Sequence, residues 1–178
     1  MSGWSAIVLL FLLGSTSAFA DAGVRLDSEL RAQLASLPPV TGDPLEAGAL
    51  DGKVVVVSFF ASWCPPCRAE FEHLNKVLSE FASDPVVIAA VNVFEEWPGT
   101  DNEGRMARFL AEFSPQFAVL TGNAQLRQSF GNVERIPTVF VFDREGEPTL
   151  HFIHARGATK MNVEIHELRE AVRLGLER

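Results

Sequence analysis

The chain has 178 residues, a length typical of one domain, with 15 basic and 23 acidic side chains that give a net charge of −8. This acidic balance argues against nucleic acids and anionic membrane surfaces as partners. Two cysteines are present and both belong to one CxxC motif, so no second pair is available for a structural disulfide or a four-cysteine zinc site.

The first twenty residues have the composition of a secretory signal peptide. They carry no charged side chain, and an apolar run at 7–13 precedes an Ala-Phe-Ala sequence at 18–20. The run is too short to span a bilayer comfortably, and no cysteine follows it for a lipid anchor. We therefore expect a signal peptide over 1–20 and a periplasmic protein. The usual Lys or Arg before the apolar run is missing, so either the amino terminus supplies the charge or the true start lies upstream. An uncleaved N-terminal membrane anchor is the alternative to cleavage.

An N-terminal arm over 21–39 precedes the main domain, which we assign to 40–178. Leucines recur at four-residue intervals from Leu26 to Leu34, with a possible N-cap at Asp27, and a Pro-Pro pair follows. This pattern predicts a short amphipathic helix. We expect the arm to be packed on the domain or partly mobile beside it.

The main domain begins with an apolar segment at 54–60 that predicts a buried strand. The strand leads through the CxxC motif into an amphipathic helix, since apolar residues recur at three- and four-residue steps from Phe71 to Phe81. Strands alternating with helices predict an α/β domain with a mixed sheet. The further strands are predicted at 86–93, 117–120, 137–142 and 149–154, the last two as an antiparallel pair, and the further helices at 102–113, 123–130 and 161–176.

The position of the cysteines at a strand-to-helix turn favours redox chemistry. Unpaired backbone N–H groups and the helix dipole favour a thiolate at Cys64, and Pro65 and Pro66 are tolerated in a first helical turn. We expect Cys64 to be the exposed, attacking sulfur and Cys67, one turn deeper, the resolving one. Half of a zinc site and a purely structural disulfide are the alternatives. The four scattered histidines and the short disulfide loop weigh against them.

The segment FFASWCPPCRAEF resembles the active-site segment of the TlpA/ResA-like thioredoxin family of extracytoplasmic thiol-disulfide oxidoreductases, in the AhpC/TSA-Redoxin-like superfamily. Residues 129–146 resemble the family's second signature, a Pro-Thr strand that ends in Asp and a Gly turn. The similarity extends over about residues 40–176. The resemblance implies a thioredoxin-like α/β fold, with a central mixed β-sheet flanked by helices on both faces.

The resemblance also implies a proton acceptor for the reaction. Glu70 matches a functional glutamate of ResA-like proteins and lies one helical turn beyond Cys67, whose proton it would remove if burial raises its pKa. An ordinary solvated glutamate is the alternative. Ser58 stands where ordinary thioredoxins have a buried aspartate, and a serine hydroxyl cannot accept a proton at neutral pH. Glu70 or water must then carry the proton.

Further residues are expected beside the disulfide, where a partner protein would bind. Pro137 matches the family's cis-proline, which faces the disulfide, with a trans proline as the alternative. The backbone of Ile136 would pair with an extended substrate segment. Trp63 is expected to be an exposed aromatic platform for the partner, and Trp97 is a candidate for the same groove.

The sequence therefore predicts a periplasmic protein-disulfide reductase that uses a Cys64–Cys67 disulfide and needs no cofactor or metal. The resemblance suggests apocytochrome c or a copper-site protein as the disulfide-bearing exported partner and a membrane thiol reductant as the electron donor; we expect a monomer. A disulfide oxidant or isomerase is an alternative that differs only in reduction potential. A Cu(I)-binding metallochaperone would use the same thiols, and an adaptor would bind extended segments without turnover.

Overall fold

The computed structural model describes residues 23–41, 43–46, 48–96, 104–154 and 156–178. The expected signal peptide, residues 102 and 103 of one predicted helix, and Trp97 lie outside these ranges. Within them, no helix combines the length and apolar character needed to cross a membrane.

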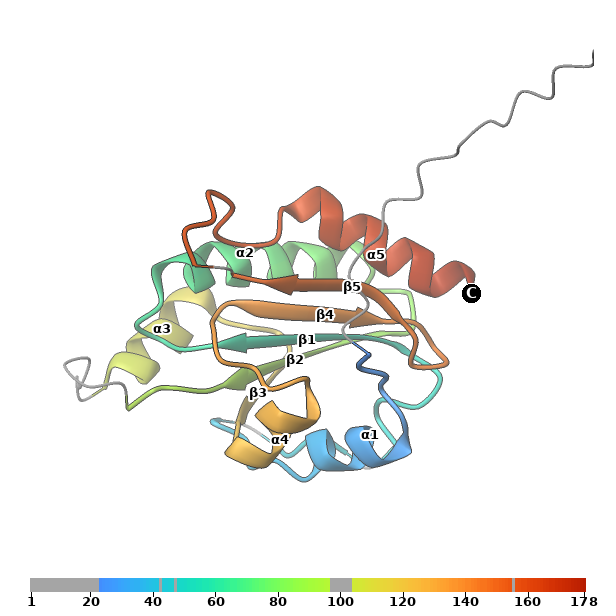
Figure 1. Ribbon diagram of the computed structural model, residues 1–178, viewed down its shortest axis with the longest axis horizontal. Helices are drawn as coiled ribbons and strands as arrows, with labels where there is room; N and C mark the ends of the chain where they lie inside the picture. Colours follow the sequence, from blue (N-terminus) through green and yellow to red (C-terminus); the bar gives the residue numbers. More distant parts are fainter. Residues whose placement is uncertain (1–22, 42, 47, 97–103, 155) are drawn as a thin grey trace, which may run out of the picture.

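The centre of the molecule is a five-stranded sheet with strand order β3-β2-β1-β4-β5 (Figure 1). Neighbours β1, β2 and β3 run parallel, whereas β4 pairs antiparallel with both β1 and β5. The predicted mixed sheet and its closing antiparallel pair are thus confirmed. The strands are β1 (Val54–Phe60), β2 (Val86–Asn92), β3 (Ala118–Thr121), β4 (Thr138–Phe142) and β5 (Pro148–Ile153).

Helices cover both faces of this sheet, as the resemblance implied. Helices α2 and α5 lie on one face, and α1 and α4 lie on the other (Figure 1). Helix α3 packs beside α2, where Phe109 of α3 lies 4.7 Å from Phe71 of α2 between ring centroids. The helices are α1 (Ser28–Ala35), α2 (Pro65–Glu80), α3 (Arg105–Phe113), α4 (Ala124–Ser129) and α5 (Ile165–Glu177).

Strand β1 is buried along its whole length because it is covered on both sides. Side chains alternate across a strand, so Phe59 and Phe60 enter two separate aromatic clusters. The ring centroid of Phe60 lies 4.5 Å from that of Phe71 on α2, whereas that of Phe59 lies 5.1 Å from that of Phe130, just after α4. Ser58 shares the side of Phe60, so the same alternation directs its hydroxyl toward α2.

The described part of the N-terminal arm is packed on the domain. Asp27 caps α1, its side chain accepting a hydrogen bond from the Leu30 amide at 2.9 Å, and both Leu30 and Leu34 are buried. Farther along, the Val40 amide donates to the Val119 carbonyl of β3 at 2.8 Å. The predicted helix is confirmed, and of the two states considered for the arm the packed one is observed.

One turn fastens the arm to the sheet. The Leu26 amide donates to the Gly146 carbonyl at 2.9 Å, and Gly146 has a φ of +85°. A Cβ at this position would overlap the Leu26 carbonyl oxygen. Gly146→Ala is therefore expected to lower the free energy of unfolding by about 2–4 kcal/mol, combining left-handed backbone strain with displacement of the arm.

Urea unfolding measures this loss, with Gly52→Ala as the matched control. Gly52 also has a positive φ, +61°, but no described atom lies within 4 Å of a Cβ built there. Gly52→Ala therefore measures the free energy lost to left-handed backbone strain without any steric overlap. Equal losses in both variants would contradict the steric role of Gly146.

Candidate active site

The two cysteines lie where β1 passes into α2. Cys64 is the N-cap of the helix, with extended backbone angles of φ −85° and ψ 109°, and the two prolines occupy the first helical positions. A disulfide joins Cys64 to Cys67 with 5.3 Å between their Cα atoms. The predicted strand-to-helix placement of the CxxC motif is confirmed.

The prediction that the Cys64 sulfur is exposed is wrong for this oxidised state. Cys64 is 2% exposed and Cys67 is fully buried. The disulfide ties the side chain of Cys64 to Cys67, which lies on the buried face of α2. Burial in apolar surroundings disfavours a thiolate, so it opposes the effect of the helix N-terminus.

Glu70 is buried on α2 rather than solvated. It is 0% exposed, and its Oε1 accepts a hydrogen bond from the Ser58 hydroxyl of β1. Its Oε2 has no hydrogen-bond partner among the described residues. Removal from water raises the pKa of Glu70 to about 8, while the Ser58 hydrogen bond and a weaker contact with the Val163 backbone act to lower it. The alternative of a solvated glutamate is wrong.

This carboxyl is suited to exchanging a proton with a thiol. Residues three apart on a helix have neighbouring side chains, so Glu70 follows Cys67 on the buried face of α2. A pKa of about 8 lies close to that of an ordinary cysteine, about 8.5. The raised pKa of Glu70 therefore lowers the uphill cost of taking a proton from Cys67.

The Ile136–Pro137 peptide bond is cis, as the resemblance implied, and the trans alternative is wrong. Strand β4 begins directly after Pro137 and runs antiparallel to β1, with Thr138 opposite Phe59. Pro137 therefore lies at the end of the sheet from which β1 leads to Cys64.

The carbonyl of Ile136 already has one partner. It accepts a hydrogen bond from Nδ1 of His154 at 3.0 Å, and the His154 amide donates to the Pro137 carbonyl at 3.1 Å. A carbonyl oxygen has two lone pairs, so pairing of Ile136 with an extended substrate stays a prediction. No spacing in the sequence indicated that His154 supports this segment.

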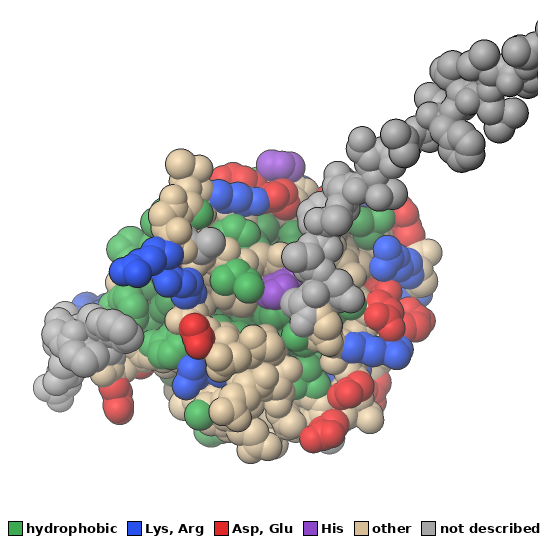
Figure 2. Space-filling view, viewed as in Figure 1, with side chains coloured by type: hydrophobic (Ala, Val, Ile, Leu, Met, Phe, Trp, Pro, Cys, Tyr) green, Lys and Arg blue, Asp and Glu red, His purple; other side chains and the backbone are tan. Residues whose placement is uncertain are grey.

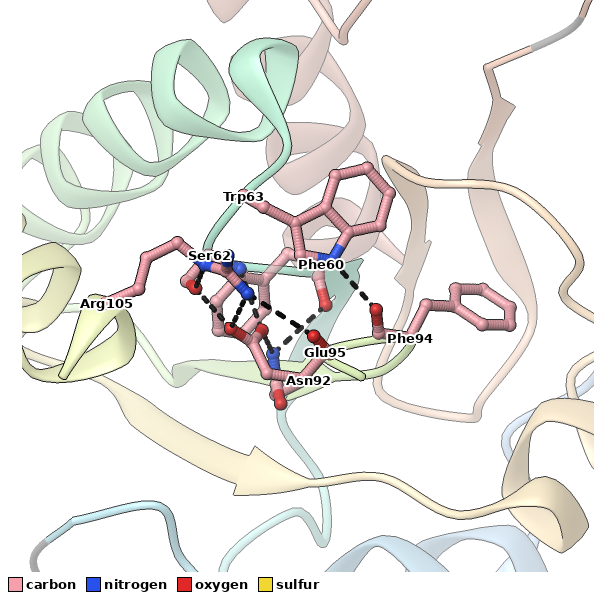
Figure 3. Close-up of polar contacts among 7 residues, drawn as sticks. All are labelled: Phe60, Ser62, Trp63, Asn92, Phe94, Glu95 and Arg105. Carbon is pink, nitrogen blue, oxygen red and sulfur yellow. Dashed lines mark hydrogen bonds and ion pairs between the residues drawn. The ribbon is translucent and has the colours of Figure 1, made fainter. Parts of the chain in front are cut away.

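Trp63 is half-buried and packs against the core, so the prediction of an exposed platform is wrong. Its indole Nε1 donates to the Phe94 carbonyl at 2.8 Å, and Phe94 has a φ of +57° (Figure 3). This bond ties the residue before Cys64 to the segment that follows β2. Contact of Trp63 with a partner stays a prediction.

A polar cluster beside the CxxC motif had no counterpart in the sequence predictions. It consists of Ser62, Asn92, Glu95 and Arg105, which we call the Glu95 cluster (Figure 3). Ser62 and Glu95 are 33 residues apart in the chain, so no local pattern connects them. The sequence did contain one signal for this cluster. Asn92 stands near the end of a predicted strand and Glu95 follows it three residues later.

The arrangement of these groups defines a class of protein. A disulfide at the start of a sheet-packed helix, at the same end of the sheet as a cis-proline and one turn from a buried acid, can exchange electrons and protons with other thiols. The protein is a thiol-disulfide oxidoreductase with a thioredoxin-like fold. More particularly, the chain belongs to the Redoxin family, whose model matches residues 28–165.

Known proteins agree with this assignment. The chain is 27% identical to thioredoxin-like protein YneN of Bacillus subtilis, over 90% of this chain and 94% of that protein. It is 28% identical to the thiol-disulfide oxidoreductase ResA of Halalkalibacterium halodurans, over 72% and 68%. A solved thiol:disulfide interchange protein from Chlorobium tepidum shares the fold, with a TM-score of 0.63, 24% identity, and coverage of 78% of this chain and 90% of that one.

The predicted resemblance to the TlpA/ResA-like family is confirmed by these matches. One boundary changes, because the family match begins at residue 28 and so includes α1. The sequence resemblance had been placed from about residue 40 onward. The arm carries no cysteine and no catalytic motif.

Proposed function

We propose that the protein works as an extracytoplasmic reductase of disulfides in other exported proteins. The observation that carries the direction of electron flow is the burial of both cysteines, with Cys64 2% and Cys67 0% exposed. Burial disfavours the thiolate and hence the reduced, ionised form of the pair. Strong oxidants instead stabilise their reduced form. The pair therefore gives its electrons away readily.

The reaction consists of two exchanges of sulfur bonds. The Cys64 thiolate attacks a client disulfide, forming a Cys64–client bond and releasing the client's other sulfur as a thiolate that takes a proton from water. Cys67 then gives its proton to ionised Glu70 and attacks the Cys64 sulfur. The client's second sulfur leaves, the Cys64–Cys67 disulfide forms, and two electrons have passed to the client. A thiol reductant restores the dithiol by the reverse exchange.

A groove along edge strand β5, which includes the residues on either side of the Ile136–Pro137 pair in sequence, supports an extended client. It has a volume of about 930 Å³ and runs from Arg135 and Thr138 along edge strand β5 to Leu174. Figure 2 views this side of the molecule, where hydrophobic side chains lie exposed among charged ones. An edge strand offers backbone groups to an extended segment.

The proposed compartment and partners rest on the sequence. The signal-like residues 1–20 favour export to the periplasm. We propose apocytochrome c or copper-site cysteines as clients and a membrane thiol reductant as the electron donor, as the family resemblance implies. A disulfide oxidant or isomerase is the competing function.

The reduction potential of the cysteine pair distinguishes these functions. We expect a value at or below about −220 mV after equilibration with glutathione buffers of known ratio, in the range of thioredoxin-type reductants. The fraction reduced is measured by alkylation and mass shift, and Cys67→Ser, which cannot form the internal disulfide, is the control. A value near about −120 mV would place the protein with strong oxidants and overturn the reductase proposal.

A further inference from the structure

We propose that Glu95 and Arg105 are positioning residues whose opposite charges balance each other beside Cys64, so that losing either one shifts how readily Cys64 ionises. They hold the segment before Cys64 between two opposite charges. The inference deepens the proposed function, on which it rests, because the rate of client attack depends on the thiolate fraction of Cys64.

The first part of the argument is the convergence of hydrogen bonds on one carboxylate (Figure 3). The Ser62 amide donates to Oε2 of Glu95 at 3.0 Å, and the Ser62 hydroxyl donates to Oε1. Asn92, the last residue of β2, donates to Oε2 at 2.8 Å and to the Phe60 carbonyl at 3.4 Å. The end of β1 and the residue two before Cys64 are thereby fixed to the end of β2.

The second part is the cation on the same group. Arg105, the first residue of α3, contacts Oε1 of Glu95 at 3.2 Å and donates through Nε to the Ser62 hydroxyl at 2.8 Å. Both side chains are largely buried, with 17% exposure for Arg105 and 27% for Glu95. Burial raises the pKa of Glu95, but the hydrogen bonds from Ser62, Asn92 and Arg105 outweigh it and hold the pKa below its usual value. The carboxylate is therefore charged at neutral pH.

The third part is the sign of each charge at Cys64. Both groups contact Ser62, two residues before Cys64. A negative charge at Glu95 disfavours a thiolate at Cys64, and a positive charge at Arg105 favours it. The intact pair nearly cancels, and partial burial limits screening by solvent. Removing one charge leaves the other uncompensated. Substitution of Glu95 and substitution of Arg105 should therefore shift the pKa of Cys64 in opposite directions. If the two residues only held the loop in place, either substitution would loosen the loop and shift the pKa of Cys64 in the same direction.

The test is the pH dependence of Cys64 alkylation by iodoacetamide in the reduced full chain. We expect the apparent pKa of Cys64 to fall in Glu95→Gln and to rise in Arg105→Gln, each by roughly 0.3–1 pH unit at low ionic strength. The double variant is expected to return near the wild-type value. In about 1 M salt, where screening acts over about 3 Å, the shifts should shrink. Shifts of the same sign, or no shifts, would overturn the inference.

A matched control comes from the exposed pair Arg169–Glu80 at the other end of α2. Glu80→Gln and Arg169→Gln are expected to leave the Cys64 profile unchanged, and a shift there equal to that in the cluster would count against a local effect. If Glu95→Gln does not fold, the Arg105→Lys variant provides the test of the inference. Lysine keeps the charge, so a profile like wild type supports the inference and one like Arg105→Gln overturns it.

Alkylation requires no client, so the outcome is independent of the proposed reductase activity. Opposite shifts in a protein that fails to reduce insulin would retain the inference and reject the function. A protein that reduces insulin but shows no opposite shifts would retain the proposed function and reject the inference.

Discussion

The Cys64→Ala variant is expected to show no disulfide reductase activity above the buffer blank. Cys64, the N-cap of α2, is assigned the attacking thiolate, and Cys67, on the buried face of the helix, is assigned resolution only. Insulin reduction in the presence of a small thiol measures the rate through the precipitation of the insulin B chain. Circular dichroism of the variant confirms that loss of activity is not loss of fold.

The companion variant Cys67→Ser separates attack from resolution. It retains the attacking sulfur and lacks the resolving one, so it is expected to accumulate a covalent complex with a disulfide-bearing client. The complex is seen as a mass increase that a thiol reductant reverses. Wild-type turnover by Cys64→Ala, or a complex formed through Cys67 in that variant, would contradict the assigned order of the two sulfurs.

The Glu70→Gln variant is expected to resolve the mixed disulfide roughly a hundredfold more slowly near pH 7, at the lower end of the range for loss of a general base. Glutamine fills the same space but cannot accept a proton. The rate of the first attack should change little, since that step uses Cys64. Rapid-quench measurement of the mixed disulfide separates the two rates.

The pH profile makes this prediction specific. In the wild type the resolving rate should rise as Glu70 ionises, with a midpoint near its pKa of about 8. Glu70→Gln should lose that rise. Ser58→Ala is the matched variant, because it removes the hydrogen bond that lowers the pKa of Glu70 and should move the midpoint upward. An unchanged resolving rate in Glu70→Gln from about pH 5 to 8 would exclude Glu70 from the reaction.

The same carboxyl makes stability depend on pH. The folded chain keeps a proton on Glu70 up to about pH 8, whereas the unfolded chain releases it near 4.5. The stability contributed by protonated Glu70 is complete below pH 4.5 and is lost as the pH rises to about 8. Between these values the free energy of unfolding should fall by about 1.4 kcal/mol per pH unit relative to Glu70→Gln. Urea titrations of both proteins across this range provide the test.

Local patterns in the sequence were sufficient for most of the fold. The apolar run at 54–60 is long enough for a strand and too short for a core helix, and it is β1. The CxxC motif between that strand and an amphipathic segment correctly indicated the start of α2. Predicting the cis bond before Pro137 required the family resemblance, because nothing in the local sequence distinguishes it from a trans proline that begins a strand.

The rest of the site depends on contacts between distant segments. Ser58 and Glu70 were each singled out, but their hydrogen bond joins a strand to a helix and forms only when both are packed. The exposure of Cys64 was misjudged because a surface turn does not reveal how the disulfide orients its sulfur. Glu95 and Arg105 were missed because they act through hydrogen bonds with Ser62, which lies more than thirty residues earlier in the chain.

The attachment of Leu26 to Gly146 has a consequence for variants that loosen it. Strand β4 begins beside Phe59, near the cysteines, and ends at Phe142 beside Val55, so the turn that follows it lies at the opposite pole of the sheet. Leu26 is therefore held at the end of the sheet away from the cysteines. A substitution that loosens this attachment acts far from the reacting sulfurs.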